Sequence, residues 1–245
     1  MAELVDALVS GTSGRKPLEV RVFFWAPSCF SFEIFMDIRL HTYDLPADVV
    51  FKDSIAVDTE AMGLKNYRDR LCLVQLSGGD GVCHLVHFPE PKFDQSPYLK
   101  QILSDPSLLR IFHYARFDVA ILMHSFQMTL GPIYCTKIAS RLVRTYTNRH
   151  GLKDLCKELL GVDLSKQEQT SDWGSPILTN EQLKYAATDV LHLHALKQKL
   201  DFLLEREKRT NLAQACFDFL PYRAHMDLIA GENFEIFSYQ TDEKG

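Results

Sequence analysis

Short apolar runs rich in β-forming residues dominate the first half of the chain. Residues 54–58, 71–76 and 82–88 each form such a run, and the segments between them carry Gly, Asn and Asp. Runs of this length, bounded by turn residues, are typical of neighbouring strands. The pattern predicts a three-stranded meander, with the Gly-Gly-Asp-Gly segment at 78–81 as the turn between its last two strands.

The pattern becomes helical after the third run. It predicts a helix over 98–103, a buried strand over 108–113 and a helix over 115–126. Three further helical stretches follow, over 137–143, 152–160 and 181 to about 219. Thr179 and Gln182 have the spacing of a capping box, which fixes the start of the last stretch by satisfying two exposed backbone donors.

One α/β domain accounts for this order of elements. Its expected fold is a mixed central sheet with an antiparallel meander, flanked by helices, because this packing buries the apolar faces of the sheet and of the helices against each other. We expect that domain to span residues 36–240, with no further domain behind it. Residues 1–35 lack the order of charges and apolar residues found in a signal peptide. We expect them to be a non-native or disordered N-terminal extension, with Met36 as the true start.

The composition is that of an ordinary globular protein, and no stretch is apolar enough for a membrane span. The net charge of −5 argues against a protein that coats long nucleic acid, since that mode needs many cations. A nucleic-acid substrate is therefore expected to be short or held locally. The six cysteines form no CxxC pair, which indicates buried thiols in a reducing, cytoplasmic compartment.

Four carboxylates lie in or next to apolar runs, where an unpaired acid is unfavourable. Asp58 and Glu60 end a strand and share one face, where they repel each other and favour a cation. Asp118 opens a helix, and Asp189 follows Tyr185 by four residues on one helical face. Taken singly, the pair on the strand fits a solvent-facing strand end, and Asp118 fits an acid that offsets the helix dipole.

Together the four acids, without a His/Cys ligand set, are the hard oxygen donors that Mg²⁺ or Mn²⁺ prefers. Two such ions activate water and stabilise the leaving oxygen during displacement at phosphorus. We expect Asp58, Glu60, Asp118 and Asp189 to bind two divalent cations. Tyr185 is expected to orient the attacking water, because a phenol with a pKa of about 10 is a poor base.

These motifs resemble the DEDDy branch of the DEDD exonucleases, which includes RNase D and proofreading domains: Asp58-Thr-Glu60 matches motif one, Asp118 motif two, and Tyr185 with Asp189 motif three. Segments 69–77, 135–140, 145–152 and 165–173 are similar in particular to NrnC-type nano-RNases, and that similarity runs from about residue 36 to 237. RNase D carries helical HRDC domains after its nuclease domain, and the resemblance predicts none here.

The resemblance implies an RNase H-like exonuclease fold and 3′-5′ degradation of very short RNA, dinucleotides preferred, to nucleoside 5′-monophosphates. It also implies a homo-octameric ring. Two alternatives stay open at this point. One is an enzyme that trims longer RNA as RNase D does, or that degrades DNA from its 3′ end. The other is a nuclease-like module that binds RNA or a nucleotide without cutting it.

Several further residues are candidates for substrate binding. Leu64 follows motif one and either wedges against a base or packs in the core. Gln75 lies on the neighbouring strand, where it is expected to approach the sugar. His113 precedes motif two and either contacts a phosphate or sugar or serves the fold. The segment before the last helical stretch is expected to close over the 5′ end of the substrate with three residues: Lys166, Gln169 and Trp173. A basic segment at 137–153 fits either a phosphate-binding surface or a solvated face.

Overall fold

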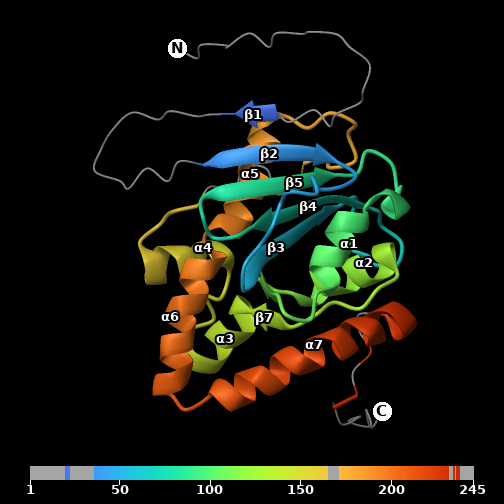
Figure 1. Cartoon of the computed structure of the whole chain (residues 1–245). Helices are drawn as coiled ribbons and strands as arrows, with labels where there is room; N and C mark the ends of the chain where they lie inside the picture. Colours follow the sequence, from blue (N-terminus) through green and yellow to red (C-terminus); the bar gives the residue numbers. More distant parts are fainter. Residues whose placement is uncertain (1–19, 23–35, 165–170, 232–233, 235, 238–245) are drawn as a thin grey trace, which may run out of the picture.

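The computed structural model describes residues 20–22, 36–164, 171–231, 234 and 236–237. Within them, one mixed sheet runs in the order β1-β2-β5-β4-β3-β6-β7 (Figure 1). The strands are β1 (Val20–Val22), β2 (Asp37–Thr42), β3 (Ser54–Ala61), β4 (Leu71–Ser77), β5 (Val82–His87), β6 (Leu109–Phe112) and β7 (Ile133–Cys135).

The predicted meander is confirmed: β3 and β4 are antiparallel, and so are β4 and β5. On the other side of β3, the strands β6 and β7 are parallel to it and to each other. Every residue of β4 is buried, because the strand is central and covered on both faces. The sheet is therefore mixed, as the sequence predicts.

Three strands were not predicted: β1, β2 and β7. β2 pairs in parallel with β5, and its sequence, DIRLHT, mixes charged and apolar residues that carry little strand signal. β7 has three residues, too few for a periodic pattern. β1 belongs to the segment 1–35 and pairs antiparallel with β2. Most of that segment lies outside the described residues, so its expected place outside the native domain stays a prediction.

The helices follow the predicted positions closely. They are α1 (Pro97–Ser104), α2 (Arg116–Phe126), α3 (Thr136–Val143), α4 (Leu152–Leu155), α5 (Asn180–Leu191), α6 (Leu193–Arg206) and α7 (Thr210–Ala230). A 3₁₀ turn precedes α1 at Phe93–Gln95, and α4 continues as a π-helix over Cys156–Leu160. The capping box at Thr179 and Gln182 is present, with both reciprocal hydrogen bonds.

The last helical stretch is longer than expected. It is divided into α5, α6 and α7, and α7 continues past residue 219 to Ala230. Pro221 lies inside α7. Proline removes one backbone donor and usually breaks a helix, so the local pattern suggests an earlier end than the one the packing supports. Leu220 and Ala224, on either side of Pro221, are both buried, and they keep this part of α7 against the domain.

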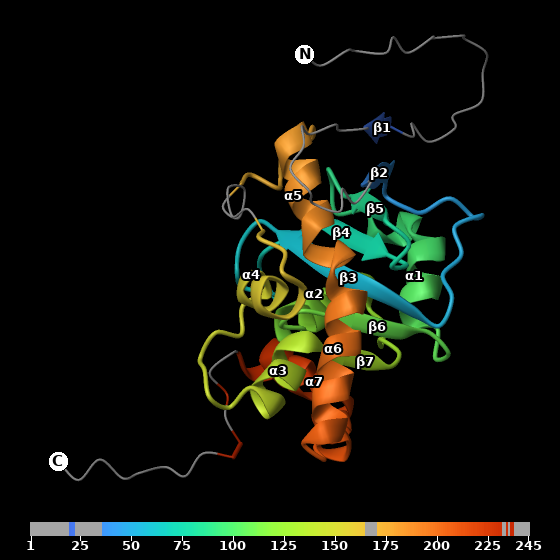
Figure 2. The same ribbon diagram turned by 90° about the vertical axis from the view of Figure 1, so that its left-hand side faces the viewer.

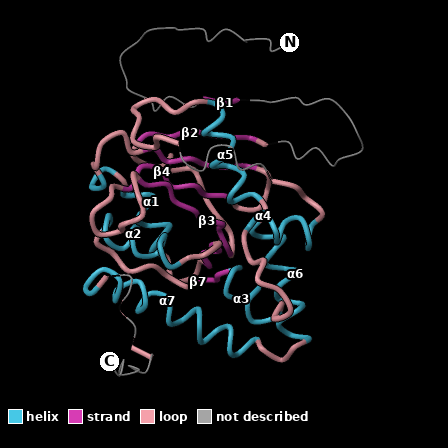
Figure 3. Tube along the Cα trace, turned by 180° about the vertical axis from the view of Figure 1, so that it is seen from behind, coloured by secondary structure: helices cyan, strands magenta, loops and turns pink. Residues whose placement is uncertain are grey.

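The helices cover both faces of the sheet. α5 lies across β5, β4 and β3 on one face, whereas α1 and α2 lie on the other (Figures 1 and 2). α7 runs past α2 and β7 at the lower edge of the molecule (Figure 3). This arrangement brings the start of α2 and the middle of α5 toward the end of β3, where the acidic motif lies.

Candidate active site

Strand β3 presents two carboxylates from one face near its end. Asp58 and Glu60 alternate with Thr59, so their side chains share the face that α5 covers. One oxygen from each lies within 4.8 Å of the other and of an oxygen of Asp189. The two acids on the strand and the acid on the helix therefore converge, although Asp58 and Asp189 are 131 positions apart in the sequence.

Helix α5 delivers Tyr185 and Asp189 from a half-buried side of the helix. Leu183, Ala186 and Val190 are buried and fix the rotation of the helix against the sheet. With that rotation, Tyr185 and Asp189, four residues apart, lie one above the other at the edge of the packed face and line the cavity. The predicted burial around Asp189 is thus confirmed.

Asp118 enters from the first turn of α2, which starts at the end of β6. The Thr59 hydroxyl donates to Asp118 Oδ1 at 2.6 Å. Because Thr59 alternates with the two acids on β3, its side chain leaves the opposite face of the strand. The same short stretch of β3 therefore carries two acids of the cluster and orients a third from another element.

The acids hold their protons more tightly than free carboxylates. Burial, followed by repulsion from Asp189 and Asp118, raises the pKa of Glu60 to about 9. Burial raises the pKa values of Asp118 and Asp189 to about 7 each, and a hydrogen bond from Thr59 or Tyr185 opposes each shift. The pKa of Asp58 is also raised, first by burial and then by the other three acids.

This cluster fits a divalent cation. Buried carboxylates that repel each other are costly unless a positive charge offsets them. Three carboxylate oxygens within 4.8 Å of one another are spaced for one shared ion. Oxygen donors alone suit Mg²⁺ or Mn²⁺ better than the softer metals that prefer His and Cys.

Tyr185 lies beside Asp189 and donates its phenol hydrogen to that carboxylate. Burial, together with the charges of Asp189 and Glu60, raises the pKa of the phenol well above its usual value. The phenol therefore stays protonated at neutral pH and acts as a hydrogen-bond donor. The Trp173 ring lies 6.2 Å from the Tyr185 ring, centroid to centroid, and covers it from the loop before α5.

These residues line one cavity of about 910 Å³. The cavity holds all five predicted catalytic residues: Asp58, Glu60, Asp118, Tyr185 and Asp189. Three of the six predicted substrate-binding residues line it too: Leu64, His113 and Trp173. Leu64 is 81% exposed, so the alternative that it packs in the core does not hold.

The other predicted substrate-binding residues differ in placement. Gln75 is fully buried on β4, opposite Asp58 in the register, and its amide has no hydrogen-bond partner within the described part of the chain. It is not among the cavity residues, and its contact with a sugar stays a prediction. Lys166 and Gln169 lie outside the described residues.

His113 is held within the fold at the edge of the cavity. Its Nδ1 lies 2.8 Å from the Thr136 hydroxyl. Burial, aided by Lys137, lowers the pKa of His113 to about 3. The imidazole is therefore neutral at physiological pH, and any contact with RNA uses a neutral ring.

The basic segment 137–153 does not act as one surface. Arg144 is buried, bonds to Ser140 and to the Arg149 carbonyl, and forms an ion pair with Glu158. Lys153 pairs with Asp163. Lys137 lies over the Tyr114 ring. A phosphate-binding role for Arg144 is therefore wrong, because its guanidinium serves the fold.

Sequence reasoning missed several cavity residues, among them Thr59, Tyr114, Arg116 and Asp227. Asp227 comes from α7 and accepts two hydrogen bonds from Arg116, at 2.6 and 2.7 Å. Arg223 pairs with the same carboxylate at 2.9 Å. An acid on the buried side of a helix would have pointed to Asp227. The predicted helical stretch ends at about residue 219, so this signal was not recognised.

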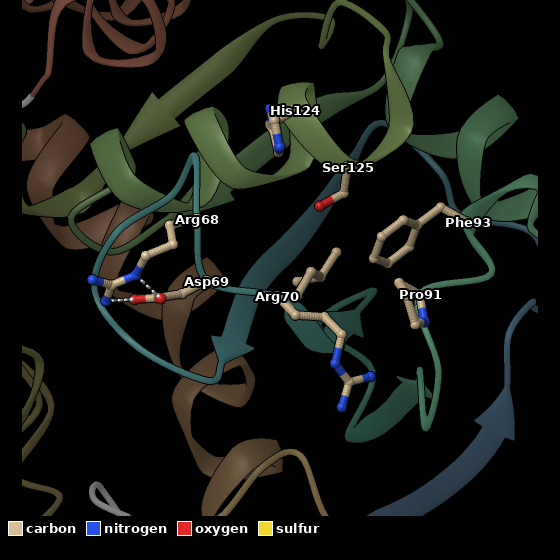
Figure 4. Close-up of a pocket in the computed structure, with 8 residues that line it drawn as sticks. Arg68, Asp69, Arg70, Pro91, Phe93, His124 and Ser125 are labelled. Atoms are coloured by element: carbon tan, nitrogen blue, oxygen red, sulfur yellow. Dashed lines mark hydrogen bonds and ion pairs between the residues drawn. The ribbon is translucent and has the colours of Figure 1, made fainter.

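A second cavity, of about 300 Å³, is lined by residues 68–71 at the end of the loop that carries Leu64, together with residues of the segments after β5 and at the end of α2. Figure 4 shows Arg68 turned onto Asp69, with Pro91 and Phe93 forming an apolar wall. Asp69 accepts hydrogen bonds from Arg68 and from the Lys65 backbone. Arg70 donates to the carbonyls of Phe88 and Pro89. These side chains shape the loop between β3 and β4, which presents Leu64 to the larger cavity.

Comparison with known proteins agrees with this site. A family model described as 3′-5′ exonuclease matches residues 42–205. A ribonuclease D of Gluconacetobacter diazotrophicus is 36% identical over 155 residues, which are 63% of this chain and 39% of that protein. The chain thus spans about two fifths of the length of this relative.

Two solved structures are more similar over their whole length. Brucella melitensis NrnC bound to pGG is 49% identical, with a TM-score of 0.80, over 83% of this chain and 99% of that one. Brucella melitensis NrnC with bound Mg²⁺ is 48% identical, with a TM-score of 0.78, over 82% and 98%.

The mixed sheet, its flanking helices and the convergent acids define the class of RNase H-like nucleases. Within that class, the chain belongs to the 3′-5′ exonuclease family. Its DEDDy motifs place it near NrnC and RNase D, as the sequence predicts. In the described part of the chain, no helix is both long and apolar enough to cross a bilayer.

Proposed function

We propose that the protein is a metal-dependent 3′-5′ exoribonuclease that hydrolyses very short RNA, dinucleotides preferred, to nucleoside 5′-monophosphates. The observation that carries the proposal is the convergence of Asp58, Glu60 and Asp189 on one point in a large cavity, with Asp118 beside them. A cluster of mutually repelling acids has no structural benefit of its own, and it suits cation binding.

In the proposed reaction, the oxygen of a water molecule bonds to the phosphorus of the 3′-terminal phosphodiester and the bond from phosphorus to O3′ breaks. The phosphate stays on the O5′ of the released nucleotide, and the O3′ leaving group takes up a proton, which balances the one that the water loses, and becomes a hydroxyl. Two Mg²⁺ or Mn²⁺ ions, when bound, acidify the water and offset the charge on the phosphate. Asp58, Glu60 and Asp189 would supply oxygen ligands to these ions, and Asp118 would complete the set. The Tyr185 phenol, which stays protonated, orients the water through its hydroxyl.

The shape and charge of the site support a short substrate. A volume of about 910 Å³ lies within the range of roughly 300 to 1,000 Å³ that is typical of small-ligand sites. Leu64 extends into this space with most of its surface exposed, as a wedge against a base would. The net charge of −5 does not favour an extended RNA contact.

The direct test uses 5′-labelled pGpG with Mg²⁺, Mn²⁺ or EDTA. We expect labelled mononucleotide with either metal and none with EDTA. Asp189→Ala is expected to abolish the product, whereas Asp218→Ala, which removes an exposed acid of α7, leaves it unchanged. Full activity of Asp189→Ala would overturn the assignment of the metal ligands.

Trimming of longer RNA is a second candidate, favoured by the identity with ribonuclease D. Arg141 and Arg149 are exposed in the basic segment and are the residues that such a substrate would meet. Arg141→Ala with Arg149→Ala is expected to slow cleavage of long RNA if that candidate is right. The non-catalytic module is disfavoured because every acid is present. The octameric ring and the cytoplasmic location stay predictions from the resemblance and the cysteine pattern.

A further inference from the structure

The wall of the catalytic cavity carries an aromatic residue in an unusual backbone conformation. Tyr114 lies between β6 and α2 with φ at +66°, in the left-handed region that side chains other than glycine rarely adopt. The residue is 58% exposed and lines the cavity that holds the acids. Strained residues with exposed rings persist where the surroundings enforce them, and they gather at binding sites.

A cation fixes the ring of Tyr114 from one side. The Lys137 ammonium group lies 3.3 Å from the ring centroid. Lys137 is itself partly buried at the start of α3, so its position is well defined. An ammonium group over one face draws electron density from the ring and leaves the other face better suited to stack on an electron-rich base.

The neighbouring rim of the cavity is apolar as well. Met62 and Leu64 line the cavity and are 61% and 81% exposed. Exposed apolar side chains beside a carboxylate cluster suit a ligand with a charged part and flat apolar parts. A short RNA has that chemistry, since its phosphates go to the cations and its bases need faces to stack on.

We propose that Tyr114 is a base-stacking residue of the substrate site, held in place by Lys137. This inference rests on the proposed function, because it assigns one nucleobase of the RNA to the ring. Tyr114 does not take part in the bond-breaking step. Its loss therefore weakens RNA binding and leaves the turnover of bound RNA nearly unchanged.

The first experiment measures KM and kcat of Tyr114→Ala and Tyr114→Trp on pGpG with Mg²⁺. Loss of one stack is expected to raise KM roughly 5- to 150-fold in Tyr114→Ala, whereas Tyr114→Trp keeps KM near that of the wild type. Tyr146→Ala is the matched control, since Tyr146 is also exposed and near a cation, Arg144, but is not among the cavity residues. Equal KM values for wild type and Tyr114→Ala would overturn the inference.

Tyr114→Gly separates binding from folding. Glycine adopts a positive φ without strain, so this variant is expected to melt at the same or a higher temperature than wild type. Its KM is still expected to rise as in Tyr114→Ala. A drop in both stability and activity would show that the ring only supports the fold, and that result would also overturn the inference.

A double-mutant cycle that combines Tyr114→Ala with dinucleotides lacking one base identifies which base stacks on Tyr114. Removal of one base from the dinucleotide is expected to raise KM in wild type and to have no further effect in Tyr114→Ala. Additive effects for both bases would contradict stacking. If wild type does not cleave pGpG at all, the proposed function fails. If wild type cleaves it and the Tyr114 variants match wild type, only this inference fails.

Discussion

The Thr59 hydroxyl donates to Asp118 Oδ1 at 2.6 Å, and this bond joins β3, which carries the first acidic motif, to the helix that carries the second. Thr59 leaves β3 on the face opposite to that of Asp58 and Glu60. The tripeptide 58–60 therefore carries two of the proposed metal ligands and sets the position of a third.

Loss of this hydroxyl is expected to weaken metal binding. Thr59→Val keeps the shape of the side chain but removes the donor, so the Asp118 carboxylate loses an oriented partner. Groups that orient metal ligands typically change affinity or activity about 10- to 100-fold. The Mg²⁺ concentration for half-maximal activity is expected to rise by that factor. Thr59→Ser keeps the donor and serves as the control; equal values for Thr59→Val and wild type would contradict the role.

The acidic cluster is expected to destabilise the metal-free protein as pH rises. In the folded state the pKa of Glu60 is about 9, against an ordinary value of 4.5, so the folded protein retains a proton that the unfolded chain has released. A raised folded pKa gives stability that is present at low pH and is lost as pH rises toward that pKa. In EDTA, the melting temperature is expected to fall between pH 6.5 and 8.5.

Glu60→Gln isolates this contribution, because the amide does not titrate. The variant is expected to have a flatter melting profile in EDTA and a higher melting temperature at pH 8.5 than wild type. Its activity is expected to fall on the order of 1,000-fold, since a metal ligand contributes several kcal/mol to the barrier. Added Mg²⁺ raises the wild-type melting temperature more at pH 8.5 than at pH 6.5. A wild-type protein that becomes more stable with rising pH would contradict the assignment.

Asp227 is expected to hold Arg116 and the end of α7 in place. The carboxylate is 1% exposed and pairs with Arg116 and Arg223. Asp227→Asn leaves the two guanidinium groups facing a neutral amide, at a cost of about 2 kcal/mol in unfolding free energy after allowance for the exposure of Arg116. Urea unfolding checks this value. Asp218→Asn on the exposed side of the same helix is the control, and an equal effect there would contradict the role.

Gly63 is expected to set the position of Leu64. A Cβ added at Gly63 would lie 2.2 Å from Asp69 Oδ2, the oxygen that accepts the Lys65 backbone hydrogen bond. Gly63→Ala therefore forces the loop between β3 and β4 to shift. We expect KM for pGpG to rise while thermal stability stays close to wild type, because the loop is at the surface. Gly161→Ala lies outside the cavity at a φ of +72°, so this control is expected to lower thermal stability and to leave KM unchanged.

The main features of the fold were predictable because they depend on local patterns. The meander and the helices around α2 and α5 have clear periodicity, and the capping box at Thr179 marks a helix start without tertiary help. β7 and β2 could not be predicted, since one is too short and the other too polar. α7 extends through Pro221 because packing against the domain outweighs the local cost of proline.

The residues of the candidate site also divide into those that a local pattern predicts and those whose position depends on tertiary packing. Asp58, Glu60 and the Tyr185–Asp189 pair follow from the face that each spacing defines. Tyr114 and Asp227 could not be predicted, because their place in the cavity depends on a positive φ and on the docking of α7. Neither property has a local sequence signal of comparable strength.

The length dependence of cleavage tests the central claim most directly. Wild-type protein with Mg²⁺ is incubated with 5′-labelled RNAs of two to about twenty nucleotides, and initial rates are compared at equal concentration. The account predicts that the dinucleotide is cleaved far faster than any longer RNA and that EDTA stops every reaction. Comparable rates at all lengths, with progressive 3′ shortening, would contradict the dinucleotide preference and make the protein a general RNA trimmer.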